Sequence, residues 1–147
     1  GGSAAAAAAL SERDVIKASD IAIDSKLGEG AFGVVYKGVY HHTVVAVKLL
    51  HATQRDEAAL AEFMAEACRL VHLRPHRHVV ACYGVVLEPQ PAIVMGYADG
   101  GALSALVYAR RHEPLDAARQ VAWLEGVALG LAHLHEEGVV HRDVATR

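Results

Sequence analysis

Three glycines near the start of the chain are spaced so that their backbone amides could lie against a phosphate. Gly28, Gly30 and Gly33 have the spacing G-x-G-x-x-G, and a backbone without Cβ atoms can approach a phosphate chain closely. Dinucleotide-binding proteins share this spacing, but there the third glycine opens a helix. Here the run Val34–Tyr36 follows Gly33, and β-branched and aromatic residues are typical of a strand. The sequence therefore predicts a glycine-rich hairpin and not a dinucleotide site.

The strands that flank these glycines place a lysine at a defined position. Gly38–Thr43 has the composition of a turn, and Val44–Lys48 is a second apolar strand that ends in a cation. Further apolar runs are separated by a turn that contains two prolines. Five strands are predicted, over residues 21–27, 34–36, 44–48, 79–86 and 92–95.

Helical periodicity follows the lysine strand and returns in the second half of the chain. Apolar residues recur every three or four positions over Thr53–Leu73, and Pro75 ends that helix. Three acids lie on it: Glu66 borders the apolar stripe, and Glu57 and Glu62 are the alternatives to it. Two more helices are predicted at 103–111 and 115–137, the second with Gly138 after its end, and a short one at 11–17.

A group of polar residues, His141-Arg142-Asp143, lies near the end of the printed sequence. In order and spacing, the glycine-rich hairpin, the V-A-V-K strand and this H-R-D triplet resemble a protein kinase domain of the tyrosine kinase or tyrosine kinase-like group. The resemblance covers residues 21–147 and stops within the catalytic loop. It implies an α+β protein kinase-like fold: a five-stranded antiparallel sheet with one regulatory helix, then the first helices of a mainly helical lobe.

The resemblance also implies how the chain is divided. We expect a flexible alanine-rich flank over residues 1–18, the small lobe over 19–94, a hinge over 95–101 and part of the large lobe over 102–147. Met95 would be the gatekeeper. Gly96 and Ala98 would offer a carbonyl and an N–H to adenine, although kinases commonly have an acid where Gly96 stands.

By this resemblance, Lys48 would contact the α- and β-phosphates of ATP. A glutamate on the following helix would hold the lysine in place. Glu66 is our prediction for that glutamate. Asp143 would accept the proton of the substrate hydroxyl, with Arg142 and His141 beside it in the catalytic loop. The residues expected to contact ATP are Leu27, Gly28, Glu29, Gly30, Ala31, Phe32, Gly33, Val35, Ala46, Lys48, Met95, Gly96 and Ala98.

Two parts of the kinase pattern are not in the printed sequence: the asparagine of the catalytic loop and the D-F-G aspartate, which hold Mg²⁺. We therefore expect the chain as printed not to catalyse phosphoryl transfer, while the protein it belongs to is an ATP-dependent kinase that requires Mg²⁺. The alternative is a pseudokinase-like module that regulates a partner. Ala145 and Arg147 resemble the tyrosine-kinase version of the loop, so a tyrosine acceptor is slightly favoured over serine or threonine.

The composition of the chain bears on its expected partners and on its location in the cell. A formal charge of −3 over 147 residues argues against a nucleic-acid partner, and ATP and a protein substrate are the expected partners. No apolar stretch reaches membrane-spanning length, and the two cysteines form no disulfide framework. We therefore expect a cytoplasmic location, either of the whole protein or of the cytoplasmic part of a larger, membrane-anchored one. The histidine pairs 133/135 and 72/76 lack a workable metal-binding arrangement, so no metal site is expected.

Overall fold

The computed structural model describes residues 10–30, 33–51, 57–110 and 115–145. The chain forms two compact units. The first comprises residues up to Leu73 together with Val80–Tyr97, and the second comprises Arg74–Val79 together with the residues from Ala98 onward. Each unit is described by itself below.

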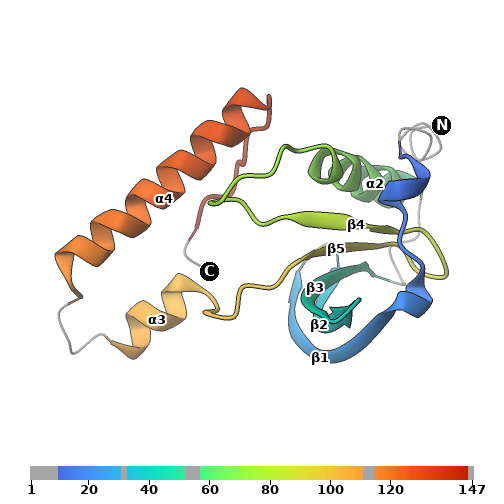
Figure 1. Cartoon of the computed structure of the whole chain (residues 1–147), viewed down its shortest axis with the longest axis horizontal. Helices are drawn as coiled ribbons and strands as arrows, with labels where there is room; N and C mark the ends of the chain where they lie inside the picture. Colours follow the sequence, from blue (N-terminus) through green and yellow to red (C-terminus); the bar gives the residue numbers. More distant parts are fainter. Residues whose placement is uncertain (1–9, 31–32, 52–56, 111–114, 146–147) are drawn as a thin grey trace. The chain divides into compact units, whose positions relative to one another are not determined.

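The first unit is built on a five-stranded antiparallel sheet with the strand order β1-β2-β3-β5-β4 (Figure 1). This sheet, together with the helices, confirms the expected α+β class. Its strands are β1 (Ile21–Gly30), β2 (Gly33–Tyr40), β3 (Thr43–Leu50), β4 (Cys82–Val86) and β5 (Ala92–Gly96).

The core of this unit follows from strand alternation in β3. Val45 and Val47 are buried in one apolar cluster, and Leu50 in another. The second cluster is completed by helix α2 (Glu57–Val71), which contributes Phe63, Met64 and Ala67. Because side chains alternate along a strand, Lys48 lies on the same face of the sheet as Leu50, which is the face that α2 covers.

Residues 10–18 pack against the sheet, where we expected part of a flexible flank. Ile16 is only 5% exposed, and its N–H donates to the Val85 carbonyl at 2.7 Å. A Cβ on Gly84 would lie 2.6 Å from the Asp14 carbonyl oxygen, so the approach of this segment to β4 requires glycine there. The packed unit therefore starts by Leu10, which lies against the α2 cluster.

A tight turn takes the place of the predicted helix over 11–17. The structure has a 3-10 turn at Glu12–Asp14. The Asp14 carboxylate accepts from the Ser11 N–H at 2.7 Å and from the Ser11 hydroxyl at 2.6 Å. These bonds satisfy the first donors of the turn, and without an apolar stripe to bury, the segment gains nothing from extending it into an α-helix.

The Ser11–Asp14 turn should make stability depend on acid. The hydrogen bonds from the Ser11 hydroxyl and then from the Ser11 N–H hold the pKa of Asp14 below its ordinary value. A lowered carboxyl pKa contributes stability at neutral pH that is lost as the pH falls below about 4. In urea unfolding, Asp14→Asn should be less stable than the wild type at neutral pH, and the gap should close in acid. The exposed Asp24 provides the control variant Asp24→Asn, and a gap that does not change with pH would contradict this assignment.

The second unit contains two helices, α3 (Leu103–Ala109) and α4 (Ala117–Glu136). The Asp116 carboxylate caps α4 by accepting from the N–H groups of Ala118 and Arg119. At the other end, Gly138 has φ +75°, and the Val139 N–H donates to the Leu134 carbonyl at 2.8 Å. This is a Schellman end, so Gly138 ends the helix as predicted.

The segment Arg74–Val79 belongs to the same unit and packs along α4. Arg74 forms an ion pair with Glu137, and its carbonyl oxygen lies 2.8 Å from His133 Nε2. A Cβ on Gly130 would lie 2.7 Å from the His78 carbonyl oxygen. Gly130 therefore allows the close approach that lets His76 stack on His133 with ring centroids 4.6 Å apart.

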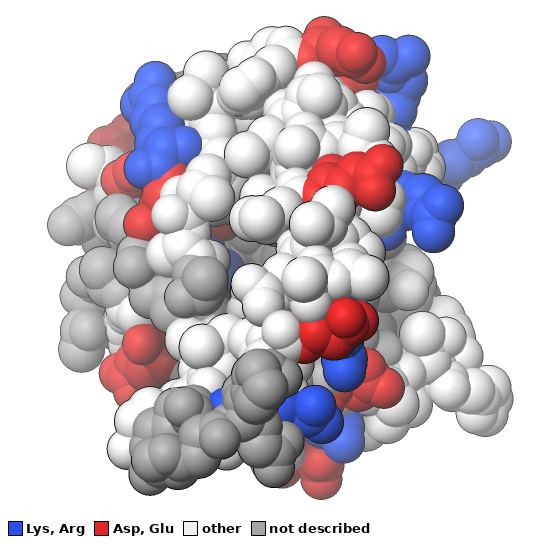
Figure 2. All heavy atoms as spheres, turned by 90° about the vertical axis from the view of Figure 1, so that its left-hand side faces the viewer, with Lys and Arg blue, Asp and Glu red and all other residues white. Residues whose placement is uncertain are grey.

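The described helices and surface residues can be compared with those expected for a membrane segment or a charged patch. Within the described ranges, no helix is both long and apolar enough to cross a bilayer. On the face drawn in Figure 2, acidic and basic side chains are interspersed among uncharged ones. Val121 and Leu124 of α4 are 63% and 70% exposed, so the apolar stripe predicted for this helix is uncovered there.

Candidate active site

An ion pair in the first unit joins β3 to α2. Lys48 Nζ donates to both carboxylate oxygens of Glu66, each at 2.8 Å. The side chains are 21% and 37% exposed, respectively, and the Phe63 ring centroid lies 6.0 Å from Nζ. The structure thus brings together the two residues that the resemblance pairs, and the bidentate contact fixes a flexible ammonium group at one position on the sheet.

The position of Glu66 follows from the packing of α2. Phe63 and Ala67 point into the core, and Glu66 lies between them in the sequence, at the edge of the buried stripe. A helix residue at such an edge can reach the sheet surface while staying in partial contact with water. Glu62, one of the alternative acids, is exposed.

The glycines of the hairpin fall into two kinds. A Cβ added to Gly28 or Gly30 would meet no atom within 4 Å, whereas one on Gly33 would lie 2.1 Å from the Leu49 carbonyl oxygen. Gly33 is therefore required by the packing of β2 on β3. Gly28 and Gly30 border open space, where a ligand backbone or phosphate could approach.

Other predicted contacts fall along the strands next to Lys48. Val35 is the register partner of both Gly28 and Lys48, and Ala46 is the partner of Met95. These pairs place Val35 and Ala46, both predicted to contact ATP, within two residues of Lys48 in the β2–β3 register. Leu27, also predicted, is 45% exposed on β1. Ala31 and Phe32 lie outside the described residues.

The predicted hinge residues fall at the end of β5 and beyond it. The Gly96 N–H donates to the Ala81 carbonyl at 2.9 Å, so Gly96 is tied to the segment that precedes β4. A Cβ on Gly96 would make only ordinary contacts, the nearest at 3.7 Å to Val80. Packing therefore does not explain the glycine at this position. Ala98 belongs to the second unit and is exposed.

The predicted catalytic loop lies in the second unit. The Asp143 N–H donates to His141 Nδ1 at 3.2 Å, and Arg142 between them has φ +61°. A non-glycine residue in the left-handed region is held there against its own preference. The loop thus turns sharply at Arg142, with the His141 ring bonded back to the backbone at Asp143.

The residues of this site suit ATP and Mg²⁺ to different degrees. The open glycines and the fixed ammonium of Lys48 suit a polyphosphate, so the site fits ATP. Mg²⁺ is different: across the described residues, no group of three or more histidine, cysteine or acidic side chains is arranged to hold a metal ion.

Sequence reasoning missed one residue at this site. His51 follows β3, and its Nε2 lies 3.0 Å from the Gly30 carbonyl oxygen and 3.7 Å from Glu29 Oε1. Glu29 was predicted as a nucleotide contact, and it also pairs with Lys26. The hydrogen bond from Lys26 is the main reason that the pKa of Glu29 is lowered, and His51 contributes less. No local spacing signals the contact of His51, because its partners lie 21 and 22 residues away.

Comparison with known proteins bears on the whole chain. The family model for protein tyrosine and serine/threonine kinases matches residues 21–147. Ankyrin repeat-containing protein kinase A of Dictyostelium discoideum is 34% identical over 134 residues, covering 90% of this chain and 9% of its own length. A probable serine/threonine-protein kinase of the same organism is 36% identical over 137 residues, covering 88% of this chain and 10% of its own length.

A human relative is similar over nearly the entire chain. Human mitogen-activated protein kinase kinase kinase 10 is 33% identical over 148 residues, covering 97% of this chain and 15% of its own length. The chain therefore spans between 9% and 15% of these three relatives. With the family model matching from β1 to the last residue, the chain belongs to the family of protein tyrosine and serine/threonine kinases.

Proposed function

We propose that this chain binds ATP against the β1–β2 hairpin, and that the protein it belongs to transfers the γ-phosphoryl group to a protein hydroxyl. The observation that carries the proposal is the bidentate Lys48–Glu66 pair on the sheet face covered by α2. A lysine that must neutralise phosphate charge needs a fixed position and a counter-ion, and Glu66 provides both.

The roles of the residues follow from their chemistry. The backbone around Gly28 and Gly30 would bind phosphate oxygens through N–H groups, a role supported by the open space at both glycines, where an added Cβ would meet no atom within 4 Å. Lys48 would contact the α- and β-phosphates. Asp143 would accept the hydroxyl proton and orient the acceptor for in-line attack. Mg²⁺ would neutralise charge on the β- and γ-phosphates, held by residues outside the printed sequence.

A regulatory module without catalysis is the alternative function. Pseudokinase-like domains often lose the lysine, the glutamate or the aspartate of the catalytic set. This chain keeps all three, as Lys48, Glu66 and Asp143, which supports the catalytic reading. The acceptor is a separate question: Ala145 favours tyrosine, while a relative named as a serine/threonine-protein kinase favours serine or threonine. Peptide substrates offered to the protein that contains this chain would distinguish a tyrosine acceptor from a serine or threonine acceptor.

We also propose that the protein is cytoplasmic.

Two glutamates of α2 provide a matched test. We expect Glu66→Gln to weaken ATP binding to the purified chain about tenfold, because the amide can no longer hold the Lys48 ammonium with two charged acceptors. Glu62→Gln changes an exposed acid on the same helix and should leave the affinity within about twofold of the wild type. Isothermal titration calorimetry measures both. An equal effect of the two changes, or no ATP binding by the wild type, would contradict the proposal.

A further inference from the structure

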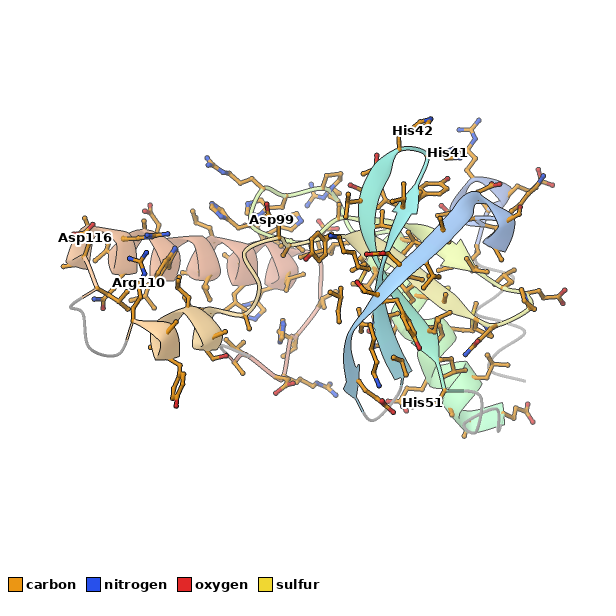
Figure 3. The ribbon with its side chains drawn as sticks, turned by 90° about the horizontal axis from the view of Figure 1, so that it is seen from below. His41, His42, His51, Asp99, Arg110 and Asp116 are labelled. Carbon is orange, nitrogen blue, oxygen red and sulfur yellow. The ribbon has the colours of Figure 1, made fainter. Side chains whose placement is uncertain are left out.

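His51 starts from a rigid base at the end of β3. The preceding residue, Leu50, is 1% exposed, and its N–H donates to the Pro91 carbonyl at 3.0 Å. The Leu50 carbonyl accepts from Gln90 Nε2 at 2.6 Å. Both bonds attach this point of β3 to the turn between β4 and β5. The His51 side chain therefore projects from a fixed position, at the end of the sheet opposite the His41–His42 turn (Figure 3).

From this base, the imidazole reaches across β2 to β1. The sheet order places β2 between the two strands, and at this level Gly33 pairs with both Gly30 and Leu50. Gly33 has no side chain that could stand between the two strands at this level. The His51 Nε2 atom ends 3.0 Å from the Gly30 carbonyl oxygen.

In the hydrogen bond between His51 and Gly30, the donor and the acceptor can be assigned. A carbonyl oxygen only accepts, so the Nε2 nitrogen that faces it carries the hydrogen and donates it. The Glu29 carboxylate, 3.7 Å from the same nitrogen, favours a donor there as well. Glu29 is also paired with Lys26 from its own strand. The end of β1 is thus held from two sides, by Lys26 within the strand and by His51 from β3.

We infer that His51 is a positioning residue, which ties the glycine-rich end of β1 to the strand that carries Lys48 and so raises the affinity for the phosphates of ATP. The inference rests on the proposed function. Gly28 and Gly30 have no side chains to restrain them and border open space. A donor three residues after Lys48 is therefore well placed to fix the Gly30 backbone relative to the strand that carries Lys48. Pre-organisation of this kind improves binding by reducing the ordering that binding requires.

The test compares two ligands and three variants of the whole chain. His51→Ala should weaken ATP binding about five- to tenfold, as expected for one hydrogen bond, and should leave adenosine binding within about twofold, because adenosine lacks the phosphates. His51→Gln places an amide donor in the same region and should restore most of the ATP affinity. His72→Ala removes an exposed histidine just after α2, whose Nδ1 lies 2.8 Å from the Cys68 carbonyl oxygen, and should change the binding of neither ligand.

A second readout needs no nucleotide. Hydrogen exchange, followed by mass spectrometry on peptides that cover residues 25–30, should be faster in His51→Ala than in wild type or His51→Gln. If the wild type binds no ATP, the proposed function fails, and the exchange data still decide whether His51 ties down β1. If the wild type binds ATP but His51→Ala matches it in affinity and exchange, the inference is overturned. An equal loss of ATP and adenosine, or a loss that His51→Gln does not restore, would also overturn it.

Discussion

Lys48→Met is expected to reduce the affinity of the chain for ATP by at least about tenfold, and up to about 150-fold. Charge-assisted hydrogen bonds contribute about 1.5–3 kcal/mol each, which converts to that range of affinity. Methionine keeps much of the aliphatic length of the lysine but has no donor for a phosphate. Calorimetric titration with ATP measures the loss directly.

The fold should survive this change. Glu66 would lose its partner, but its side chain is 37% exposed and can be solvated by water. Lys17→Met provides a matched control, since Lys17 is exposed and lies before the first strand. An ATP affinity for Lys48→Met equal to that of the control would contradict the assigned role of Lys48.

Gly33→Ala is expected to lower the free energy of unfolding by about 3 kcal/mol. The added Cβ would lie 2.1 Å from the Leu49 carbonyl oxygen and 3.0 Å from the carbonyl carbon. Both are backbone atoms of β3, so no side chain can move aside to relieve the overlap. The strands must separate where the ladder joins Gly33 to Leu50.

The other two glycines give the contrast that tests this account. Gly28→Ala and Gly30→Ala place a methyl group in open space and should change the unfolding free energy by less than about 1 kcal/mol. They should nevertheless weaken ATP binding, because the methyl group occupies the path of the phosphates. Urea unfolding of the three variants, paired with ATP titration, separates the two kinds of glycine. Equal destabilisation by all three changes would show that the distinction is wrong.

The sequence predicted those parts of the site that depend on local order. The glycine spacing, the strand after Gly33 and the lysine within the next strand each occupy a few consecutive residues. Glu66 could be chosen over Glu57 and Glu62 because the apolar stripe of α2 has a readable edge. The end of α4 at Gly138 was equally local, since a glycine after the last turn is a direct signal.

What sequence reasoning missed depends on contacts between distant residues. Ile16 belongs to the core only because it meets Val85 on β4, and its surroundings in the sequence look like a flank. The need for glycine at position 33 comes from the Leu49 carbonyl, 16 residues later. His51 reads as an isolated histidine after a strand until Gly30 lies beside it. Such pairs have no signature in spacing or periodicity.

The most direct test of the central claim is covalent labelling of the wild-type chain with a biotin-bearing acyl-phosphate derivative of ATP. The probe transfers its acyl group to a lysine amine that lies next to the bound phosphates, and digestion with mass spectrometry identifies that lysine. The chain has four lysines, at positions 17, 26, 37 and 48, so three of them serve as internal controls. We predict that Lys48 is labelled and that excess ATP suppresses its labelling, while ATP does not change labelling at the other three. Absence of ATP-sensitive labelling at Lys48, or its appearance at another lysine instead, would contradict an ATP site at the Lys48–Glu66 pair.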